Sequence, residues 1–256
     1  HKYDFLIVGA GLIGALAALA LSQKKLKVLV VDKQNSTSLD KRTLAVNANS
    51  REFLKKLKIW NSLDTNPQPI EKIVISDYIS SSPLIFENSN ETMGSVVFNS
   101  ELLKNARKKL KNMKILYSGV NINLSDLQSN KTISIKKKNY KFNKIIISAG
   151  KNVDFNDEHK SVLFDDGNYS YVGFFTHTKR HLNTAYEIFN SEGPLAVLPC
   201  PSKNENKSTF IYSTKNEITF SEIISLINKN FSSSHGKINL EKKIHKFPIT
   251  PFLRKN

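Results

Sequence analysis

The sequence has little cysteine, few acidic residues and no long uninterrupted hydrophobic run, and each shortage excludes a class of protein. Cys200 is the only cysteine, so the chain cannot form an internal disulfide and has no cysteine pair for a zinc or redox site. The longest apolar stretch near the N-terminus, residues 5–21, contains three glycines and is typical of neither a signal peptide nor a membrane span. We therefore expect a cytoplasmic protein with no metal site.

Acidic residues are outnumbered by basic ones, 22 to 38, which gives a net charge of +16. Clustered lysines neutralise phosphates, so such a balance is one signature of nucleic-acid binding. The lysines are, however, spread along the whole chain, and runs such as Lys136-Lys137-Lys138 are short, which favours a solvated surface. We expect no nucleic-acid partner, while peripheral contact with the anionic inner face of a membrane stays open.

Two short apolar runs flank an alanine-rich segment near the N-terminus and predict a β-α-β unit. Residues 5–8 and 28–31 are fully apolar, as in strands buried on both faces, and residues 13–23 are rich in alanine and leucine. Helical spacing of apolar residues predicts helices over 50–57 and 100–110, the second with Ser100 as its N-cap. Further strands are predicted at 114–117, 132–136, 144–148, 171–176, 184–189, 195–198 and 209–213, and a last helix at 218–230.

The order of these strands indicates two kinds of sheet. The pair at 132–136 and 144–148 is expected to form a small antiparallel excursion that returns to the main sheet. The strands from residue 171 onward alternate apolar and polar residues, which suits an antiparallel sheet with one covered face.

The sequence GAGLIG, Gly9 to Gly14, lies between the first predicted strand and the helix, the context in which a GxGxxG pattern indicates dinucleotide binding. Gly9 permits a tight turn, Gly11 lets the backbone approach a pyrophosphate, and Gly14 lets the helix pack close to the strand. The phosphates are then expected at the helix N-terminus. Asp32 lies 18 residues after Gly14, where a carboxylate accepts hydrogen bonds from a ribose 2′-hydroxyl and disfavours the 2′-phosphate of NADP.

Segments beyond this fingerprint resemble one family of flavoproteins. They are DKRTLAVNANSREFLKKLKIW (40–60), VVFNSELLKNA (96–106), HLNTAYEIFNSEGPLAVLP (181–199) and KFPIT (246–250). Together they are similar to FAD-dependent aromatic hydroxylases related to para-hydroxybenzoate hydroxylase, with the closest likeness to the ring hydroxylases of ubiquinone biosynthesis. The resemblance implies bound FAD, NAD(P)H as the co-substrate that reduces it, and a lipid-tailed aromatic substrate.

The fold that this resemblance implies is of the α/β class. A Rossmann-type FAD-binding domain with a central parallel sheet is joined by an inserted or appended, mainly antiparallel substrate-domain sheet. We expect the FAD-binding domain at 1–70 and 95–165, and the substrate domain, incomplete at its C-terminal end, at 71–94 and 166–256.

The expected cofactor contacts combine the fingerprint with positions matched to the family. The fingerprint group comprises Gly9, Ala10, Gly11, Leu12, Ile13, Gly14, Asp32 and Lys33. By resemblance, Arg42 reaches the phosphate or ribityl region, Asn99 begins a helix near the cofactor, and the backbone of Val120 meets the adenine. The alternatives are a surface arginine for Arg42 and a plain helix cap for Asn99. No catalytic side chain can be named, because the flavin carries the chemistry.

Two departures from the family pattern bear on this assignment. SAGKN (148–152) stands where family members carry an aspartate-glycine pair, and the chain ends at Asn256 before the family's second flavin motif. We therefore expect the N-terminal portion of an enzyme, and whether this portion alone holds FAD stays open.

Several residues without a family match receive structural interpretations. His177 and His181 flank two cations in a predicted strand connection and are expected to be solvent-exposed. Cys200 lies between two prolines and is expected to be structural. Tyr186 and Phe189 are expected to pack against neighbours rather than face a substrate.

The sequence thus favours an FAD-dependent monooxygenase that uses NAD(P)H and O2 to hydroxylate a polyprenyl phenol or quinol in ubiquinone biosynthesis. One alternative is a non-catalytic member of a quinone-biosynthesis assembly that binds the other enzymes. Another is a different flavoprotein of the same fold, such as a reductase or a halogenase.

Overall fold

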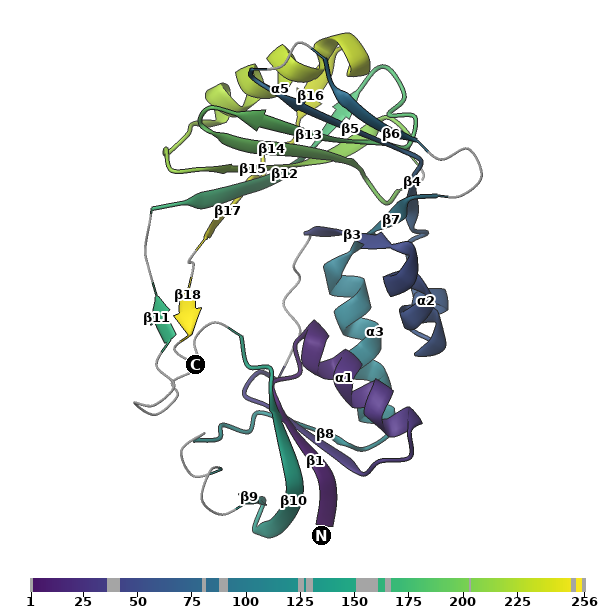
Figure 1. The fold of residues 1–256 in the computed structure, drawn as a ribbon, viewed down its shortest axis with the longest axis vertical. Helices are drawn as coiled ribbons and strands as arrows, with labels where there is room; N and C mark the ends of the chain where they lie inside the picture. Colours follow the sequence, from purple (N-terminus) through teal and green to yellow (C-terminus); the bar gives the residue numbers. More distant parts are fainter. Residues whose placement is uncertain are drawn as a thin grey trace.

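The structure, a computed structural model, describes residues 2–35, 42–79, 82–87, 92–123, 127, 131–150, 161–163, 167–202, 204–249 and 252–254, the segments 161–163 and 252–254 by their backbone alone. Figure 1 shows two parts, one above the other, each built around its own sheet. The lower part contains the N-terminus, and the upper part contains most of the C-terminal half.

The lower sheet has the order β8-β2-β1-β10-β9. Its strands are β1 (Lys2–Val8), β2 (Val28–Asp32), β8 (Leu116–Ser118), β9 (Thr132–Ile135) and β10 (Lys138–Ile147). β1 pairs in parallel with β2 and β10, β2 pairs in parallel with β8, and β9 is antiparallel to β10. The predicted β-α-β unit and the antiparallel excursion are therefore both confirmed.

Both faces of this sheet are buried, which explains its fully apolar strands. One face packs on α1 (Leu12–Gln23) and α3 (Asn99–Asn112), with small residues such as Ala15, Ala18 and Ala106 at the contact. The alternate residues of β1 and β2, such as Leu6 and Leu29, form a second buried cluster with Leu127 and with residues of β9 and β10, including Tyr140 and Phe142. α3 begins at Asn99 with Phe98 at its N-cap position, so the predicted Ser100 cap is wrong and Ser100 lies within the first turn.

A short three-stranded sheet lies between the two parts (Figure 1). It has the order β3-β7-β4, with β3 (Thr43–Asn47), β7 (Gly94–Phe98) and β4 (Gln68–Ile70). α2 (Ala48–Lys56) and the 3-10 turn η1 (Trp60–Ser62) follow β3. Sequence periodicity predicted α2 but none of these three strands, because each is short and its partners lie far away in the chain.

The upper sheet has eight strands. Seven follow the order β16-β12-β15-β14-β13-β5-β6, and β17 also pairs with β12. They are β5 (Lys72–Asp77), β6 (Leu84–Glu87), β12 (Tyr169–His177), β13 (Thr184–Asn190), β14 (Gly193–Pro199), β15 (Lys207–Thr214), β16 (Ile238–Leu240) and β17 (His245–Pro248). All neighbours are antiparallel except β13 and β5. A separate two-stranded sheet pairs β11 (Ser161–Leu163) with β18 (Phe252–Arg254).

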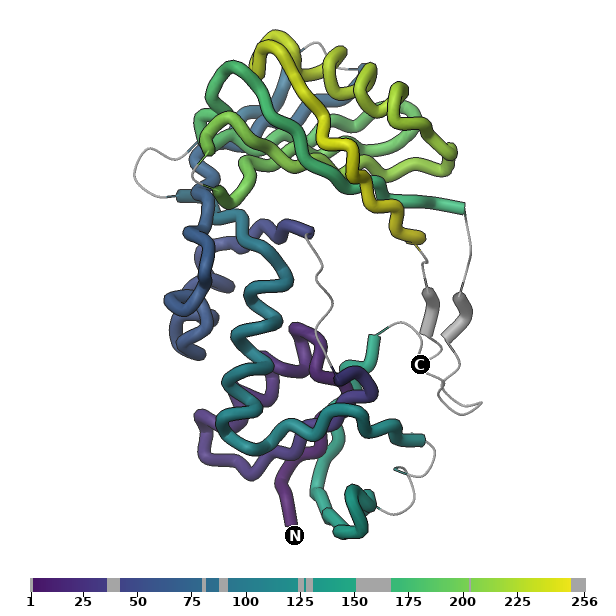
Figure 2. Tube along the Cα trace, turned by 180° about the vertical axis from the view of Figure 1, so that it is seen from behind, coloured from purple at the N-terminus to yellow at the C-terminus, as the bar shows by residue number. Residues whose placement is uncertain are grey.

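One face of the upper sheet is covered by α5 (Phe220–His235), which Thr219 and Glu222 begin with a capping box. Ile223, Ile227 and Phe231 of α5 are buried against the sheet. The opposite face is turned toward the lower part (Figure 1). Because β5 and β6 belong to this sheet yet precede α3 in sequence, the chain crosses between the parts more than once (Figure 2). The predicted combination of a parallel FAD-binding sheet with a mainly antiparallel sheet is confirmed.

The expectation that His177 and His181 are exposed is wrong. His177 and His181 are 5% and 3% exposed, and His235 at the end of α5 is 1% exposed. The rings of His177 and His235 meet edge to face with centroids 4.6 Å apart, and His181 lies beside His177 at 6.2 Å. β12 extends to His177, and the connection that follows it folds against the end of α5, so the histidines turn inward while Lys179 and Arg180 face solvent.

Tyr186 packs as expected, with its ring 5.3 Å from that of Phe231. Phe189 is 48% exposed, so its predicted packing is wrong. The two residues are three positions apart on β13, and the alternation of a strand places them on opposite faces.

Candidate cofactor site

The glycine turn after β1 has different physical requirements at its three glycines. Gly9 has a φ of +98°, and a Cβ there would lie 2.5 Å from the carbonyl oxygen of Ser148. A Cβ on Gly14 would lie 2.0 Å from the carbonyl oxygen of Gly9. A Cβ on Gly11 would meet nothing within 4 Å. Gly9 and Gly14 are therefore required by the packing of the turn, whereas Gly11 faces open space.

The N-terminus of α1 begins at this turn. Gly11 is its N-cap and provides no side-chain cap, and the first helical hydrogen bond runs from the Ala15 N–H to the Gly11 carbonyl. The helix itself therefore supplies no acceptor for the N–H groups of Leu12, Ile13 and Gly14. Such a helix end, which has no acidic residue in its first turn, favours an anionic group such as a phosphate.

Asp32, at the end of β2, is a buried acceptor shared by several donors. Its Oδ2 accepts from the Ala10 N–H at 2.6 Å and from Arg107 Nη1 at 3.0 Å, and its Oδ1 accepts from the Gln34 N–H at 2.7 Å. A carboxylate offers about four acceptor positions. One position is therefore left for a ribose hydroxyl, which fits the role predicted for Asp32.

Arg107 is a residue of this site that the sequence reasoning missed. Besides Asp32, its guanidinium donates to the carbonyls of Ala10 (3.2 Å) and Gln34 (3.0 Å) and to Ser118 Oγ (3.2 Å). It thus ties together the glycine turn, the segment after β2, and β8. Its position on the buried face of the predicted helix over 100–110 was the available signal, because a buried arginine needs acceptors.

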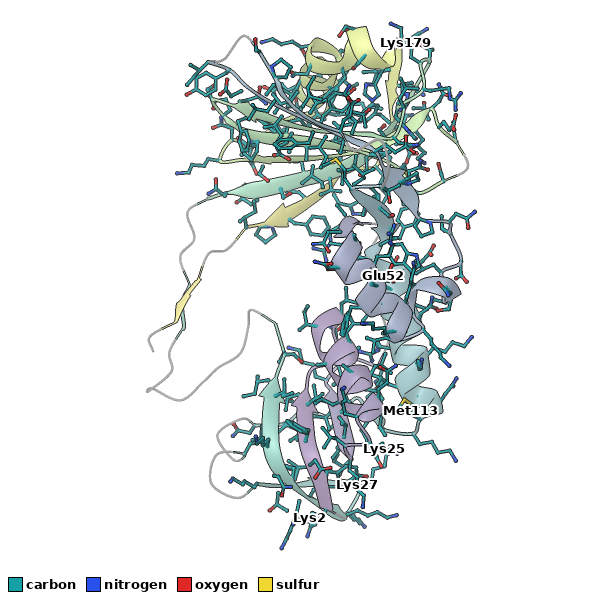
Figure 3. All side chains as sticks on the ribbon, turned by 45° about the vertical axis from the view of Figure 1, so that its right-hand side comes forward. Lys2, Lys25, Lys27, Glu52, Met113 and Lys179 are labelled. Carbon is teal, nitrogen blue, oxygen red and sulfur yellow. The ribbon has the colours of Figure 1, made fainter. Side chains whose placement is uncertain are left out.

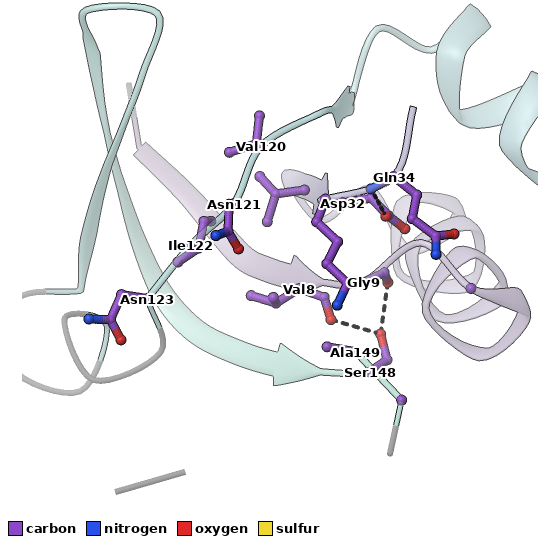
Figure 4. Close-up of a pocket in the computed structure, with 14 residues that line it drawn as sticks. Val8, Gly9, Asp32, Gln34, Val120, Asn121, Ile122, Asn123, Ser148 and Ala149 are labelled. Carbon is purple, nitrogen blue, oxygen red and sulfur yellow. Dashed lines mark hydrogen bonds between the residues drawn. The ribbon is translucent and has the colours of Figure 1, made fainter. Parts of the chain in front are cut away.

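Ser148 begins SAGKN (148–152), the segment that stands where the family carries an aspartate-glycine pair. Its hydroxyl donates to the carbonyls of Gly9 at 2.8 Å and Val8 at 3.1 Å, so it joins the end of β10 to the glycine turn (Figure 4). Lys151 and Asn152, the rest of this departure, lie outside the described residues.

A cavity of about 510 Å³, here called the nucleotide cavity, opens at the carboxyl ends of β1, β2, β8 and β10 (Figure 4). Of the predicted residues, Gly9, Gly11, Asp32, Lys33 and Val120 line it. Its other lining residues are Val8, Val31, Gln34, Asn121, Ile122, Asn123, Ser148, Ala149 and Gly150. Most of these follow β8 or β10 directly, and the rule that ligands bind at the carboxyl ends of parallel strands was the signal that could have found them.

The remaining predicted residues lie beside the nucleotide cavity or apart from it. Ala10 and Gly14 contact lining residues: the Ala10 N–H donates to Asp32, and Gly14 packs against the Gly9 carbonyl. Leu12 and Ile13 begin α1. Arg42 does not line it: its guanidinium lies over the ring of Phe247 in β17, 4.8 Å from the centroid, beside a separate cavity of about 240 Å³. Asn99 donates its backbone N–H to the Arg42 carbonyl at 3.0 Å. The structure thus brings Arg42 and Asn99 together at the junction of the two parts.

A third cavity, here called the interface cavity, lies between the N-terminal end of α3 and the upper sheet and has a volume of about 540 Å³. Phe98 and Phe174 form an aromatic wall, with ring centroids 6.4 Å apart. Lys207 lies on the neighbouring strand β15, with Nζ 5.2 Å from the Phe174 centroid and 2.6 Å from Glu241 Oε1. Thr65, Ser100, Glu101, Cys200, Pro201 and Ser202 complete the lining. Cys200 is buried, in agreement with its predicted structural role.

Comparison with known proteins places this geometry in context. Residues 2–119 match a family model described as an FAD binding domain. The ubiquinone hydroxylase UbiL of Rhodospirillum rubrum is 25% identical over 238 residues, which cover 84% of this chain and 52% of that protein. The chain therefore spans about half the length of this curated relative.

Solved structures share the fold at low identity. The flavin-dependent brominase Bmp2 has a TM-score of 0.69 at 10% identity, covering 100% of this chain and 69% of that one. The p-nitrophenol 4-monooxygenase PnpA of Pseudomonas putida DLL-E4 has a TM-score of 0.67 at 8% identity, covering 99% and 70%. These matches confirm the resemblance to the FAD-dependent aromatic hydroxylases: residues 2–119 match an FAD binding domain, and the chain shares its fold with a flavin-dependent brominase and a p-nitrophenol 4-monooxygenase.

Proposed function

We propose that this chain belongs to an FAD-dependent monooxygenase that hydroxylates the aromatic ring of a polyprenyl phenol or quinol in ubiquinone biosynthesis, with NAD(P)H and O2 as co-substrates. The observation that carries the proposal is the pairing of a nucleotide cavity in the lower part with an aromatic-walled interface cavity at its junction with the upper sheet. The likeness to a protein named ubiquinone hydroxylase supports the choice of substrate.

The residues of the nucleotide cavity suit the ADP half of FAD. The N–H groups at the start of α1 would bind the pyrophosphate, and the remaining acceptor position of Asp32 would bind the ribose. The backbone after β8, at Val120, would border the adenine, because it lies on the cavity wall and is held by a hydrogen bond from its N–H to the Asp32 carbonyl (3.0 Å). When bound, FAD supplies the redox chemistry with NAD(P)H and O2.

The interface cavity suits an aromatic ring that carries hydroxyl groups. Phe98 and Phe174 offer an apolar surface for a ring. Lys207 and the carboxylates of Glu101 and Glu241 offer polar partners for hydroxyl groups at its edge. We assign this cavity to the head group of the substrate, where it would be held and shielded from water next to the cofactor-binding part.

Cofactor binding is tested first, by the visible spectrum of the purified chain after addition of FAD. We expect bound flavin, and its loss in Asp32→Ala, because that variant removes the ribose acceptor. If the purified chain binds no flavin under any condition, the nucleotide cavity does not hold FAD in the isolated chain.

Substrate binding is tested by filling the interface cavity. Ser202→Trp adds a large side chain at the cavity wall, and we expect it to weaken binding of a short-chain prenyl phenol more than tenfold while flavin binding stays unchanged. Ser221→Trp, on the exposed first turn of α5, is the matched control. Equal binding by both variants would assign the substrate to another place.

Turnover is tested in the complete natural protein. We expect consumption of NAD(P)H and O2 that depends on a polyprenyl phenol, with formation of the hydroxylated ring. A non-catalytic role in a quinone-biosynthesis assembly is the second candidate, favoured by SAGKN (148–152), which has no aspartate where the family carries an aspartate-glycine pair. That role predicts no turnover with any polyprenyl phenol, together with recovery of partner enzymes in a pull-down.

A further inference from the structure

The edge of the lower sheet opposite the nucleotide cavity carries a line of lysines. The parallel strands lie in the order β8-β2-β1-β10, and each has lysine at its amino end. Lys114 precedes β8, Lys25 and Lys27 precede β2, Lys2 begins β1, and Lys136 and Lys137 form the turn before β10. These six residues, here called the basic edge, come from the amino ends of four neighbouring strands and therefore lie at the same end of the sheet. Figure 3 shows Lys2, Lys25 and Lys27 together at the lower end of the molecule, far from Lys179.

The basic edge is exposed and weakly compensated. All six lysines are exposed, and within the described part of the chain none makes an ion pair with a carboxylate. The acidic side chain closest in sequence, Asp4, accepts from the backbone N–H of Lys27 at 2.8 Å. Lys58, at the end of the neighbouring helix α2, adds positive charge next to Lys109, whose pKa is lowered by burial and then by Lys58.

Four of these lysines occupy backbone positions that favour glycine. Lys25, Lys114, Lys136 and Lys137 have φ values of 62°, 58°, 49° and 64°, in the left-handed region where a Cβ is disfavoured. Lys25 and Lys114 end α1 and α3 in the same way. The N–H groups of Lys25 and Lys114 donate to the carbonyls of Ser22 and Lys111, three residues earlier. The N–H groups of the next residues, Leu26 and Ile115, donate to the carbonyls of Leu21 and Leu110, five residues earlier. Glycine is the usual residue at this position of a helix end.

A lysine in left-handed backbone costs stability relative to glycine, and a function for its positive charge would explain why it is there. We propose that the basic edge docks on the anionic headgroups of a lipid bilayer. Met113, which is 40% exposed beside Lys114, favours a lipid surface over a nucleic acid, because it adds an apolar side chain that can enter the interface. The nucleotide cavity lies at the opposite edge of the same strands, so docking leaves it open.

Because these positions favour glycine, a Lys→Gly substitution removes the charge without destabilising the fold. We compare the chain with Lys25→Gly, Lys114→Gly, Lys136→Gly and Lys137→Gly against a control in which Lys215, Lys229, Lys237 and Lys242 of the upper part are changed to Gln. Each variant lowers the net charge by four, from +16 to +12. The glycine variant is expected to have an unchanged or higher Tm, because it relieves left-handed backbone.

Binding is measured by co-sedimentation with phosphatidylcholine vesicles with and without phosphatidylglycerol. We expect binding to the anionic vesicles at low salt, its loss at high salt, and a drop of more than about a hundredfold in the glycine variant, since each lysine near the surface is worth roughly fivefold. The control is expected to bind nearly as well as the unchanged chain.

Two outcomes would overturn the proposal. An equal loss in the control and the glycine variant would mean that overall charge, and not this edge, drives binding. Tighter binding of duplex DNA than of vesicles, lost in the glycine variant, would reassign the edge to nucleic acid. Neither measurement depends on turnover, so failure here leaves the proposed enzymatic function untouched.

Discussion

The guanidinium of Arg107 lies 3.0 Å from Oδ2 of Asp32, and both side chains are nearly buried, with 5% and 10% of their surface exposed. Arg107 lies on α3 and Asp32 at the end of β2, so this pair joins a helix to the strand end that carries the predicted ribose acceptor. Arg107 also donates to the carbonyls of Ala10 and Gln34 and to Ser118, and these hydrogen bonds connect the glycine turn, the segment after β2, and β8.

Removing Arg107 alone leaves the carboxylate of Asp32 buried without its cationic partner. We expect Arg107→Leu to reduce the free energy of unfolding by about 3–5 kcal/mol, measured by urea unfolding. The double variant with Asp32→Asn is expected to lose less than the sum of the two single variants, because the buried charge is then absent. Additive losses would show that the two side chains contribute independently.

The glycine turn allows a second prediction, in which two similar substitutions differ in their main effect, one on stability and the other on flavin binding. Gly14→Ala forces a Cβ against the Gly9 carbonyl, and we expect it to destabilise the chain by about 1–3 kcal/mol. Gly11→Ala meets nothing and is expected to cost less than about 1 kcal/mol.

Gly11→Ala is nevertheless expected to weaken FAD binding, because its methyl group would lie where we propose that the pyrophosphate approaches the helix N-terminus. Thermal unfolding of the flavin-free chain and flavin titration together check this pair. Unchanged flavin affinity in Gly11→Ala would move the pyrophosphate away from this turn.

Local patterns were sufficient to predict the elements that make the nucleotide cavity. The apolar runs at 5–8 and 28–31, the alanine-rich helix and the three glycines all depend on neighbours within about 30 residues, so their burial and turn geometry follow from sequence spacing. The prediction that Asp32 ends the second strand rests on the same spacing and agrees with the structure.

Features that depend on distant contacts could not be read in this way. Helical spacing places Arg107 on the buried face of α3, but its four acceptors could not be read from it, because they come from segments far apart in the chain. The HTKRH segment has the composition of an exposed loop, yet His177 and His181 are buried because α5, more than 40 residues later, ends against them. Arg42 was placed by resemblance, and its contact with Phe247 depends on β17 near the other end of the sequence.

Cys200 provides a third prediction, on reactivity. Burial raises the pKa of its thiol to about 12, so the reactive thiolate is scarce at neutral pH. We expect native chain at pH 8 to react with a disulfide reagent at least about a hundredfold more slowly than urea-unfolded chain, followed by absorbance of the released thiol. Rapid labelling of the folded chain would mean that the wall of the interface cavity opens readily.

The buried histidines predict how stability depends on pH. Burial, with repulsion from neighbouring histidines, lowers the pKa of His181 and of His235 to about 4, and burial also lowers that of His177. Because the unfolded chain binds protons near pH 6.5 and the folded chain does not, unfolding takes up protons between these values. Stability is therefore full above pH 6.5 and falls as the pH drops toward 4, by about 1.4 kcal/mol per pH unit for each histidine. The carboxylates of Glu52, Asp64, Glu217 and Glu222 have pKa values lowered from 4.5 or 3.8, so their contribution to stability is lost at the acidic end of this range and below it.

His235→Phe tests this dependence on the most buried of the three histidines. The Nε2 atom of His235 is buried without a hydrogen-bond partner, while its ring packs against Phe175, Tyr186 and Phe231. A phenyl ring keeps these aromatic contacts and removes the unpartnered nitrogen. It also loses the hydrogen bond between Nδ1 and Ser234 Oγ (2.8 Å), but that hydroxyl keeps the Phe231 carbonyl as a partner. We therefore expect higher stability at every pH and a slope smaller by about one proton between pH 6.5 and 4. Urea unfolding across this range measures the slope, with Lys229→Gln on the exposed face of the same helix as the control. A slope in His235→Phe equal to that of the unchanged chain would show that His235 has the same pKa in the folded and unfolded chains, and the acid sensitivity would then have to come from other groups.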